Sequence, residues 1–407
     1  MTNKCRVCLS EMIDVISYGD MPLANAFLLP EQYEAEYFFD LAIAHCPSCK
    51  MLQLIDQPDP AMMFHGEYAF FSGTSKAMAS HFEEKANHHI DDFIKDTSNA
   101  FAVELGSNDG IMLKNYAKKG IKHLGIEPSA NVAQVAMDNG VDTIVAFFGE
   151  DTAKKVLESH GPADIISASN VMCHIPDLHS VGKGVDALLK ADGIFEFEDP
   201  YLGSMISKTS YDQIYDEHVY IFSVTSVSNA FASYGLEVFH VEPLETHGGS
   251  MRYFLCRTGA HPIRDSVLNQ RAIEDEMGLG EVETYKKFAQ SCEKNKTDLV
   301  ELLKDLKAQG KRVVGYAATS KSTTILNYCG IGPDLIECIY DTTPIKQGKY
   351  SPGTHIPVKS FAEFYDKAPD YAVLFAWNHS KEILAKETEY TAAGHNWIFF
   401  CPEVKVA

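Results

Sequence analysis

The stretch FAVELGSNDG, residues 101–110, decides the fold of this chain. A short, mostly apolar run ends in a turn bounded by Gly106 and Gly110, and the pattern that follows is helical. Glycines permit a positive φ and let a ligand lie against bare backbone. The turn lacks the third glycine of a dinucleotide fingerprint, so it offers no clear seat for a pyrophosphate. We therefore predict a strand, a ligand-binding turn and a helix.

Two further strands follow at the spacing of an alternating α/β sheet. The run HLGIEPS, residues 123–129, ends the second strand with Glu127, about 20 residues after the glycine turn. Nucleoside-binding sheets place there the carboxylate that chelates two ribose hydroxyls. The run ADIISASN, residues 163–170, is the third strand and ends at Asn170. The sequence therefore predicts a central α/β domain that binds one nucleoside.

The composition indicates a globular protein with more than one domain. The chain has 407 residues, of which 45% are hydrophobic and 22% charged, and one hydrophobic core rarely serves that length. Its 56 acidic and 35 basic side chains give a formal charge of −21. This field repels polyanions and argues against DNA or RNA as a partner, although a local basic pocket can still bind a small anion.

The sequence also predicts a cytoplasmic protein without a membrane partner. No stretch approaches the ~20 apolar residues of a membrane span, and the start MTNKCRVCLS lacks the apolar core of a signal peptide. In a reducing compartment, closely spaced cysteines indicate metal binding rather than disulfides. We expect a monomer.

Four of the ten cysteines form two CxxC pairs that lie far apart in the sequence. Two intervening residues let both thiolates reach one zinc ion at about 2.3 Å, and four sulfurs close a tetrahedral site. The alternatives are four ordinary buried cysteines or a nucleic-acid-binding ribbon, and the acidic intervening loop, residues 29–45, weakens the ribbon alternative. We predict a structural zinc on Cys5, Cys8, Cys46 and Cys49.

The segment SYDQIYDEHVYIFS, residues 210–223, gathers three tyrosines, two aspartates, one glutamate and one histidine. It follows neither the two-residue period of a strand nor the 3.6-residue period of a helix, so we predict an active-site loop. A histidine with a pKa near 6.5 suits proton abstraction near neutral pH, and a carboxylate such as Glu217 can orient His218. The alternative is a polar cluster that only joins two domains.

The C-terminal third reads as a helical connector and a second open α/β sheet. Residues 261–309 are charged and helix-rich. Residues 311–324 predict a strand, a polar loop with Lys321 and a helix, whose N-terminus attracts phosphate. Further strands are predicted at 335–341 and 371–379. The alternative is a domain that only packs against the catalytic one.

With these motifs, residues 101–175 resemble the class I S-adenosylmethionine methyltransferases. Nearly the whole chain resembles the sugar C-methyltransferases that make branched deoxysugars from nucleotide-linked 4-keto sugars. The shared motifs are the two CxxC pairs and, in order, YAFFSGTS (68–75), VELGSNDG (103–110), SNVMCH (169–174), YDEH (215–218), HGGSMR (247–252) and KQGKYSPGTHIP (346–357).

The resemblance implies an α/β architecture of three parts. These are a small zinc-binding domain (1–66), a Rossmann-like S-adenosylmethionine methyltransferase domain (67–260), and a helical connector with a Rossmann-like nucleotide-sugar-binding domain (261–407). It implies His218 as the base, with Tyr215, Glu217 and His174 beside it. The implied cofactor-binding residues are Tyr68, Ser75, Gly106, Asn108, Asp109, Glu127, Phe147 and Asn170. The implied substrate-binding residues are His247, Ser250, Arg252, Lys321, Asp341, Lys346, Tyr350 and Thr354.

The implied reaction is methyl transfer from S-adenosyl-L-methionine to carbon 3 of a nucleotide-diphospho-4-keto-6-deoxysugar. A sugar carbon becomes a nucleophile only after a base removes a proton acidified by the ketone, and Tyr215 or His174 can hydrogen-bond the resulting oxyanion. Two other classes remain open: an NAD-dependent nucleotide-sugar oxidoreductase or epimerase, and a non-catalytic zinc-ribbon interaction protein.

The chain departs from the family pattern at two places. Asp216 stands where relatives have the first histidine of Tyr-His-Glu-His, so the resemblance assigns this position no role. Residues 317–322 read AATSKS where relatives often have a proline and a glycine. The base of the nucleotide, thymine or guanine, is therefore open.

Overall fold

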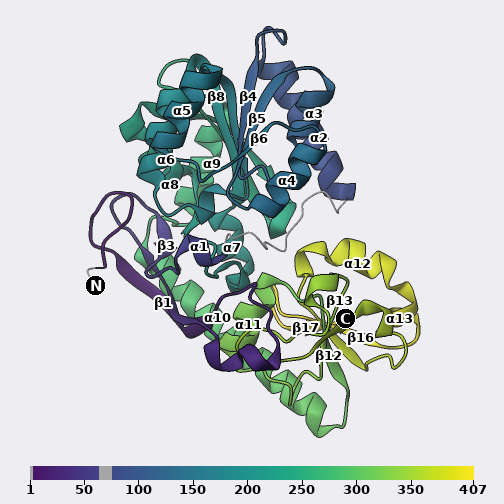
Figure 1. Ribbon diagram of the computed structural model, residues 1–407. Coiled ribbons are helices and arrows are strands. Elements are labelled where there is room, and N and C mark those ends of the chain that lie inside the picture. The colour runs from purple at the N-terminus through teal and green to yellow at the C-terminus, as the bar shows by residue number, and fades with distance from the viewer. Residues whose placement is uncertain (1–2, 64–75) are drawn as a thin grey trace.

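The computed structural model describes residues 3–63 and 76–407, and three sheets organise them (Figure 1). The seven-stranded sheet fills the upper half of Figure 1 and the six-stranded sheet fills the lower half. The purple N-terminal strands lie at the left, and β1 runs down beside α10 and α11. This architecture confirms the predicted combination of an N-terminal cysteine-bearing domain and two α/β sheets.

The N-terminal sheet is antiparallel and takes one strand from far along the chain. Its order is β1-β2-β3-β9. The predicted loop at 29–45 is instead the 3-10 helix η1 and strand β2, because alternate apolar residues of β2 point into a core. The elements are β1 (Ile13–Pro22), η1 (Pro30–Ala35), β2 (Phe38–His45), β3 (Leu52–Leu54), the short helix α1 (Pro60–Met63) and β9 (Tyr220–Ile221).

The central sheet has the order β10-β11-β8-β7-β4-β5-β6. Its five strands β4 to β8 are parallel, and β10 and β11 are antiparallel additions. The strand order reverses at β4, and ligands of such sheets bind beyond the carboxyl ends of the strands at that point. The strands are β4 (Phe101–Leu105), β5 (Lys122–Glu127), β6 (Thr143–Val145), β7 (Ala163–Ser169), β8 (Leu189–Pro200), β10 (Leu236–Leu244) and β11 (Ser250–Arg257).

Helices cover both faces of the central sheet (Figure 1). One apolar cluster joins α2, α3 and α4 to one face, and another joins α5, α6 and α8 to the other face. The helices and short 3-10 helices are α2 (Lys76–Phe93), α3 (Leu113–Lys118), α4 (Ala130–Asp138), α5 (Glu150–His160), η3 (Met172–His174), α6 (Leu178–Leu188), α7 (Leu202–Lys208), η4 (Tyr211–Gln213), α8 (Val224–Phe231), η5 (Ala232–Tyr234) and η6 (Thr246–Gly248).

The C-terminal sheet has the order β14-β13-β12-β15-β16-β17, and all pairs except β16 with β17 are parallel. The predicted strands at 335–341 and 371–379 are shorter than expected, since loop and 3-10 residues fill the rest. The elements are α9 (Asp265–Glu276), α10 (Val282–Ala308), β12 (Val313–Tyr316), α11 (Ser320–Cys329), β13 (Ile339–Asp341), η7 (Pro344–Lys346), β14 (Val358–Ser360), η8 (Phe361–Glu363), β15 (Tyr371–Leu374), η9 (Trp377–His379), α12 (Ser380–Lys386), α13 (Thr388–Ala392), β16 (Asn396–Phe399) and β17 (Lys405–Val406).

One apolar core crosses from the N-terminal sheet into the C-terminal part. Tyr18 and Met21 of β1 share it with Phe288 of α10 and Ile325 of α11. The segment 210–223 lies between these parts, and every one of its residues is buried. In the described residues, we find no helix that combines the length and the apolar surface needed to cross a membrane.

Candidate active site

The four paired cysteines gather at one point of the N-terminal domain. The Cys5 and Cys49 sulfurs are 3.5 Å apart, and those of Cys8 and Cys46 are 3.4 Å apart. All four sulfurs lie within 4.8 Å of one another. The 3.4 and 3.5 Å separations are longer than the ~2.05 Å bond of a disulfide. Four thiolates about 2.3 Å from a tetrahedral zinc leave similar spacings between their sulfurs. The donor set and its geometry therefore fit a closed zinc site.

The glycine turn and the acid that follows β5 lie together at the carboxyl edge of the central sheet. Gly106 and Gly110 have φ of 61° and 77°, as predicted, and a side chain at Gly106 would come within 2.5 Å of Val171. The Glu127 carboxylate accepts hydrogen bonds from the Asn108 and Ser129 amides at 2.9 and 2.8 Å. Burial raises the pKa of Glu127. Two hydrogen bonds leave this carboxylate further acceptor capacity for hydroxyl groups.

Asn170 lies at the same edge, just beyond β7. Its φ of 57° is left-handed, and its amide N–H donates to the Glu198 carbonyl oxygen at 2.7 Å. Its side-chain oxygen is buried and has no hydrogen-bond partner among the described residues. Because an unpaired buried acceptor is costly, this atom fits a ligand that brings a donor to the turn.

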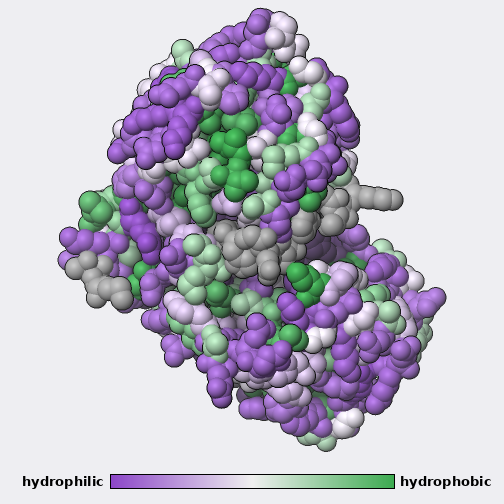
Figure 2. Space-filling model, viewed as in Figure 1, coloured by the Kyte–Doolittle hydropathy of each residue, from purple (hydrophilic) through white to green (hydrophobic). Residues whose placement is uncertain are grey.

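Hydrophobic side chains reach the viewed surface over β6 (Figure 2). Phe147, which follows β6, is 54% exposed, whereas the adjacent Phe148 is buried in the core. Phe147 is therefore the aromatic side chain available beside the sheet edge that carries Glu127. Tyr68 and Ser75, also predicted to bind cofactor, lie outside the described residues.

His218 sits in a buried, defined hydrogen-bond arrangement. The Gln213 carbonyl oxygen lies 2.6 Å from Nδ1, and because a carbonyl only accepts, Nδ1 carries the proton. The Tyr215 hydroxyl lies 2.8 Å from Nε2 and donates to it. The His174 ring stacks on His218 with 5.3 Å between centroids. His218 thus has an unprotonated Nε2, the form that a general base needs.

The surroundings of His218 favour its neutral form. Burial lowers its pKa well below the ordinary value, and the nearby His174, Lys321 and His247 lower the pKa further. Burial also lowers the pKa of His174 to about 3 and that of His247 to about 4. All three histidines are therefore neutral near pH 7, and His218 is available to accept a proton.

The two carboxylates of the YDEH motif bind the N-terminal domain instead of His218. Glu217 accepts a hydrogen bond from the Asn25 side chain at 2.7 Å, and Asp216 accepts one from the Ala24 amide at 2.9 Å. We expected Glu217 to orient His218, but the group that contacts Nδ1 of His218 is the Gln213 carbonyl. Asp216 fixes the chain that leads out of β1.

Asn25 links this segment to the C-terminal domain, because its side-chain oxygen accepts from Ser320 at 3.1 Å. Lys321, at the start of α11, donates to the His247 carbonyl at 3.2 Å. Lys346 donates to the Ala318 carbonyl at 2.8 Å. Burial lowers its pKa, and the neighbouring Asp341 and Glu217 offset this only in part. The predicted residues Lys321, Lys346 and His247 therefore lie close to the segment 210–223.

Other predicted substrate residues have structural contacts. Asp341 accepts from the Ala318 and Thr343 amides, both at 2.6 Å, and so holds the turn before α11. Tyr350 pairs through its backbone with Leu28. The Thr354 and Ser351 hydroxyls are 2.9 Å apart, and Ser250 donates to the Thr246 carbonyl at 3.0 Å.

Comparison with known proteins gives matches over nearly the whole chain. Three family models match in order: "Putative zinc binding domain" at residues 5–64, "Methyltransferase domain" at 78–241 and "C-methyltransferase C-terminal domain" at 245–402. The C-methyltransferase NovU of Streptomyces niveus is 35% identical over 407 residues, which cover 99% of this chain and 96% of NovU. The chain belongs to this C-methyltransferase family. It is a methyltransferase with S-adenosyl-L-methionine as cofactor and a zinc-binding domain.

Weaker matches concern the methyltransferase domain alone. The ubiquinone biosynthesis O-methyltransferase of Colwellia psychrerythraea is 29% identical over 108 residues, 25% of this chain and 44% of that protein. Among solved structures, the magnesium protoporphyrin IX methyltransferase of Synechocystis with bound SAM is 11% identical at a TM-score of 0.32. The match covers 44% of this chain and 81% of that one.

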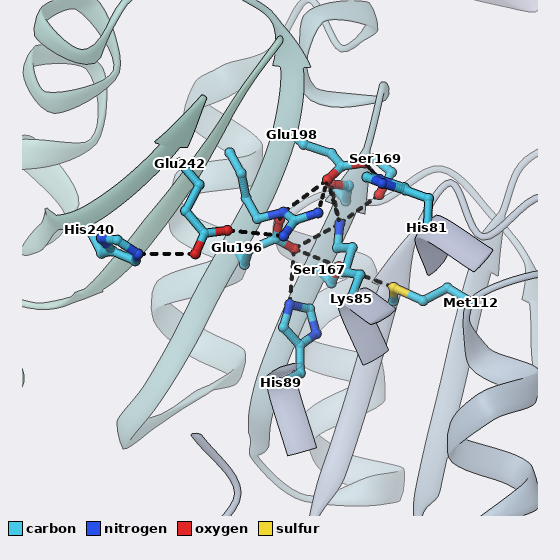
Figure 3. A network of polar contacts seen from close by, with 12 residues as sticks. His81, Lys85, His89, Met112, Ser167, Ser169, Glu196, Glu198, His240 and Glu242 are labelled. Atoms are coloured by element: carbon cyan, nitrogen blue, oxygen red, sulfur yellow. Dashed lines mark hydrogen bonds and ion pairs between the residues drawn. The ribbon is translucent and has the colours of Figure 1, made fainter. Parts of the chain in front are cut away.

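In this C-methyltransferase, Glu196, Glu198 and Glu242 belong to a network of polar contacts (Figure 3). Arg252 forms ion pairs with all three. Its guanidinium nitrogens bond to Glu198 at 2.7 and 2.9 Å and to Glu242 at 3.1 Å, and Glu196 lies 3.2 Å away. Carboxylates engage all three of its nitrogens, and its predicted role in substrate binding stays a prediction. These ion pairs connect β11 to β8 and β10.

Sequence reasoning missed the remaining members of this network. Lys85 of α2 is fully buried, 2.9 Å from Glu196 and 2.6 Å from the Ser169 hydroxyl. His81 lies 2.6 Å from Glu198. The signal available was the alternation FEFE at residues 195–198, which puts two acids on one face of a buried strand and requires cations opposite.

We predict that Glu127→Ala weakens adenosylhomocysteine binding. The change removes a charged acceptor for hydroxyl groups, worth about 1.5 to 3 kcal/mol, so the Kd should rise roughly 10- to 150-fold. Glu127→Gln separates lost charge from lost volume, and Glu158→Ala, an exposed acid on α5, is the control. Calorimetric titration measures the Kd, and a wild-type value for both Glu127 variants would show that the hydroxyl-binding acid lies elsewhere.

Proposed function

We propose that this enzyme methylates carbon 3 of a nucleotide-diphospho-4-keto-6-deoxysugar, within branched-chain deoxysugar biosynthesis in the cytoplasm, and acts as a monomer. The observation that carries the proposal is His218, buried with Nδ1 protonated and Nε2 directed at the Tyr215 hydroxyl. A methyltransferase that forms a carbon–carbon bond needs a base, since carbon is a nucleophile only after it loses a proton.

Each bound group has residues suited to it. Cys5, Cys8, Cys46 and Cys49 are the proposed zinc ligands, because their sulfurs converge. The turn at Gly106, with Asn108, Asp109 and Asn170, is proposed to hold the amino-acid end of the cofactor, Glu127 its ribose and Phe147 its adenine. The bound cofactor supplies an electrophilic methyl group.

In the proposed reaction, His218 takes the proton next to the ketone on Nε2, and Gln213 holds the ring in the tautomer that makes this possible. The Tyr215 hydroxyl pivots from Nε2 to the ketone oxygen, where it stabilises the developing enolate. The Lys321 ammonium group adds positive potential close to the developing enolate. His174, stacked on His218, keeps water from one face of the ring.

The substrate would lie between the catalytic segment and the start of α11. Lys321 and Lys346 are the cations there, and the helix N-terminus offers backbone donors to a diphosphate. Both lysines have pKa values lowered by burial, so an anionic partner between them would restore favourable charge pairing.

The low pKa of His218 predicts how activity depends on pH. A base works only in its unprotonated form, and burial moves the pKa of His218 well below 6.5. The fraction of active base therefore stays near one at pH 6.5, and kcat/KM falls only as the pH drops through the lowered pKa. If kcat/KM at pH 6.5 were already half of its maximum while the protein stayed folded, His218 would not be the base.

Product analysis tests the function. The enzyme is incubated with S-adenosyl-L-methionine and each member of a panel of 4-keto nucleotide sugars carrying thymine or guanine, and the products are analysed by mass spectrometry and NMR. We expect one panel member to gain a methyl group on carbon. The NMR spectrum distinguishes carbon 3 from carbon 5, which also flanks the ketone, and methylation on oxygen or on no sugar would defeat the proposal.

A further inference from the structure

The zinc domain and the proposed base belong to one sheet. Leu52 of β3 pairs with Ile221 of β9, Gln53 pairs with Tyr220, and the Leu54 amide donates to the Val219 carbonyl at 2.8 Å. The segment with His218 enters β9 directly. The backbone immediately after His218 is therefore held by a strand of the zinc domain.

That strand begins at a cysteine knuckle. The Cys46 amide donates to the Met51 carbonyl at 2.8 Å, and the Lys50 amide donates to the Cys46 carbonyl at 2.9 Å. These bonds close the turn that carries Cys46 and Cys49 and lead the chain into β3. The position of β3 is thus tied to the second CxxC pair through backbone contacts alone.

Gln53 ties the same strand to the first CxxC pair through its side chain. Its amide nitrogen donates to the Cys5 sulfur at 3.0 Å, and its oxygen accepts from the Arg6 amide at 3.0 Å. Gln53 is only 1% exposed, and both ends of its amide are used. Hydrogen bonds to metal-bound thiolates orient the ligands, so Gln53 contacts both the metal site and the strand that faces β9.

Tyr220 extends the connection to the other side of the site. Its hydroxyl donates to the Pro176 carbonyl at 2.6 Å, two residues beyond His174. Tyr220 is fully buried, so this bond has no competing water. The strand that faces Gln53 therefore contacts both chain segments that carry the stacked histidines.

We propose that Gln53 is a positioning residue that transmits the geometry of the zinc-thiolate site through the β3–β9 pairing to His218. The zinc-binding domain then helps to fix the position of His218, in addition to stabilising its own fold. The role in catalysis rests on the proposed function, whereas the mechanical coupling between Gln53 and β9 does not.

The test uses Gln53→Leu, which keeps the side-chain volume and removes both hydrogen bonds, in the full-length zinc-loaded enzyme. Gln57→Leu, beyond the end of β3, is the matched control. Zinc content should stay at wild-type level, because all four cysteines remain. Amide hydrogen exchange should become about tenfold faster in peptides covering 217–222 and stay unchanged in β4, since only the local pairing is loosened.

The kinetic readout separates positioning from simple loss of stability. Gln53→Leu should lower kcat about tenfold, with the Kd of adenosylhomocysteine unchanged, because a small displacement of the base affects chemistry and not cofactor binding. Gln53→Glu keeps the acceptor for the Arg6 amide but replaces the donor to Cys5 by a negative charge beside the thiolate, so exchange at 217–222 and kcat should change at least as much as in Gln53→Leu. If Gln53→Leu does not fold, the same measurements of zinc content, amide exchange, kcat and Kd on Gln53→Glu test the inference.

If amide hydrogen exchange at 217–222 were unchanged in the zinc-loaded Gln53 variants, the inference would be overturned, whatever their activity. Faster exchange there with unchanged kcat would overturn the positioning role. If His218→Ala proved fully active, the proposed base would fail, while exchange in the Gln53 variants would still report the coupling. The two ideas can therefore fail separately.

Discussion

His218→Ala is expected to lower kcat by about 10² to 10⁴ while adenosylhomocysteine binds as in wild type, because the change removes the general base and leaves the glycine turn intact. His218 is buried, and its two ring nitrogens contact Gln213 and Tyr215. Single-turnover rates with S-adenosyl-L-methionine and the methylated sugar identified from the panel measure the loss. Sugar binding must be measured on the same sample, since an imidazole can also position substrate.

Two companion variants separate loss of the base from loss of packing. His218→Asn keeps an amide N–H close to the Nδ1 position, so the Gln213 carbonyl retains a donor, but it offers no basic nitrogen. His179→Ala replaces an exposed histidine on α6 and should behave as wild type. Near wild-type turnover in His218→Ala and His218→Asn would exclude His218 as the base and leave His174 or Tyr215 as candidates.

The double variant Cys46→Ser with Cys49→Ser is expected to lose its zinc and several kcal/mol of stability. Structural zinc binding contributes about 10 to 16 kcal/mol in zinc-finger peptides, which is as large as the 5 to 15 kcal/mol that stabilises a typical domain. The knuckle also leads into β3, so the loss should reach the segment 217–222. Elemental analysis and thermal unfolding measure both effects.

The control for this variant is Cys256→Ser with Cys338→Ser, two buried cysteines outside the cluster. This control also replaces two buried cysteines by serine. It should keep one equivalent of zinc and show only a modest fall in melting temperature. Full zinc content in Cys46→Ser with Cys49→Ser would show that the four sulfurs do not form the metal site.

The parts of the fold that follow local rules were predictable from sequence. Residues 101–105, 122–127 and 163–169 form strands because apolar residues fill both faces of a covered parallel sheet, and Gly106 marks the turn because only a small residue fits against Val171. The convergence of the cysteines followed from CxxC spacing, since two such turns can share one tetrahedral ion.

The parts that depend on long-range pairing were not predictable. Nothing in VYIF at 219–222 indicates that Tyr220 and Ile221 pair with β3, and nothing in EH at 217–218 indicates that Glu217 bonds to Asn25 while Gln213 orients His218. Local patterns in a single sequence do not reveal which distant partner satisfies a buried polar group. The same limit hid Lys85, because nothing in the sequence around it indicates that Glu196 lies 2.9 Å away.

Hydrogen exchange at carbon 3 of the sugar tests the proposed reaction most directly. The 4-keto nucleotide sugar is incubated in heavy water with adenosylhomocysteine and either wild-type enzyme or His218→Ala, and loss of the carbon 3 proton signal is followed by NMR. We predict exchange catalysed by the wild type without methyl transfer, and exchange at the rate of buffer alone with His218→Ala. Equal exchange with both proteins, or wild-type exchange no faster than in buffer, would contradict proton abstraction by His218.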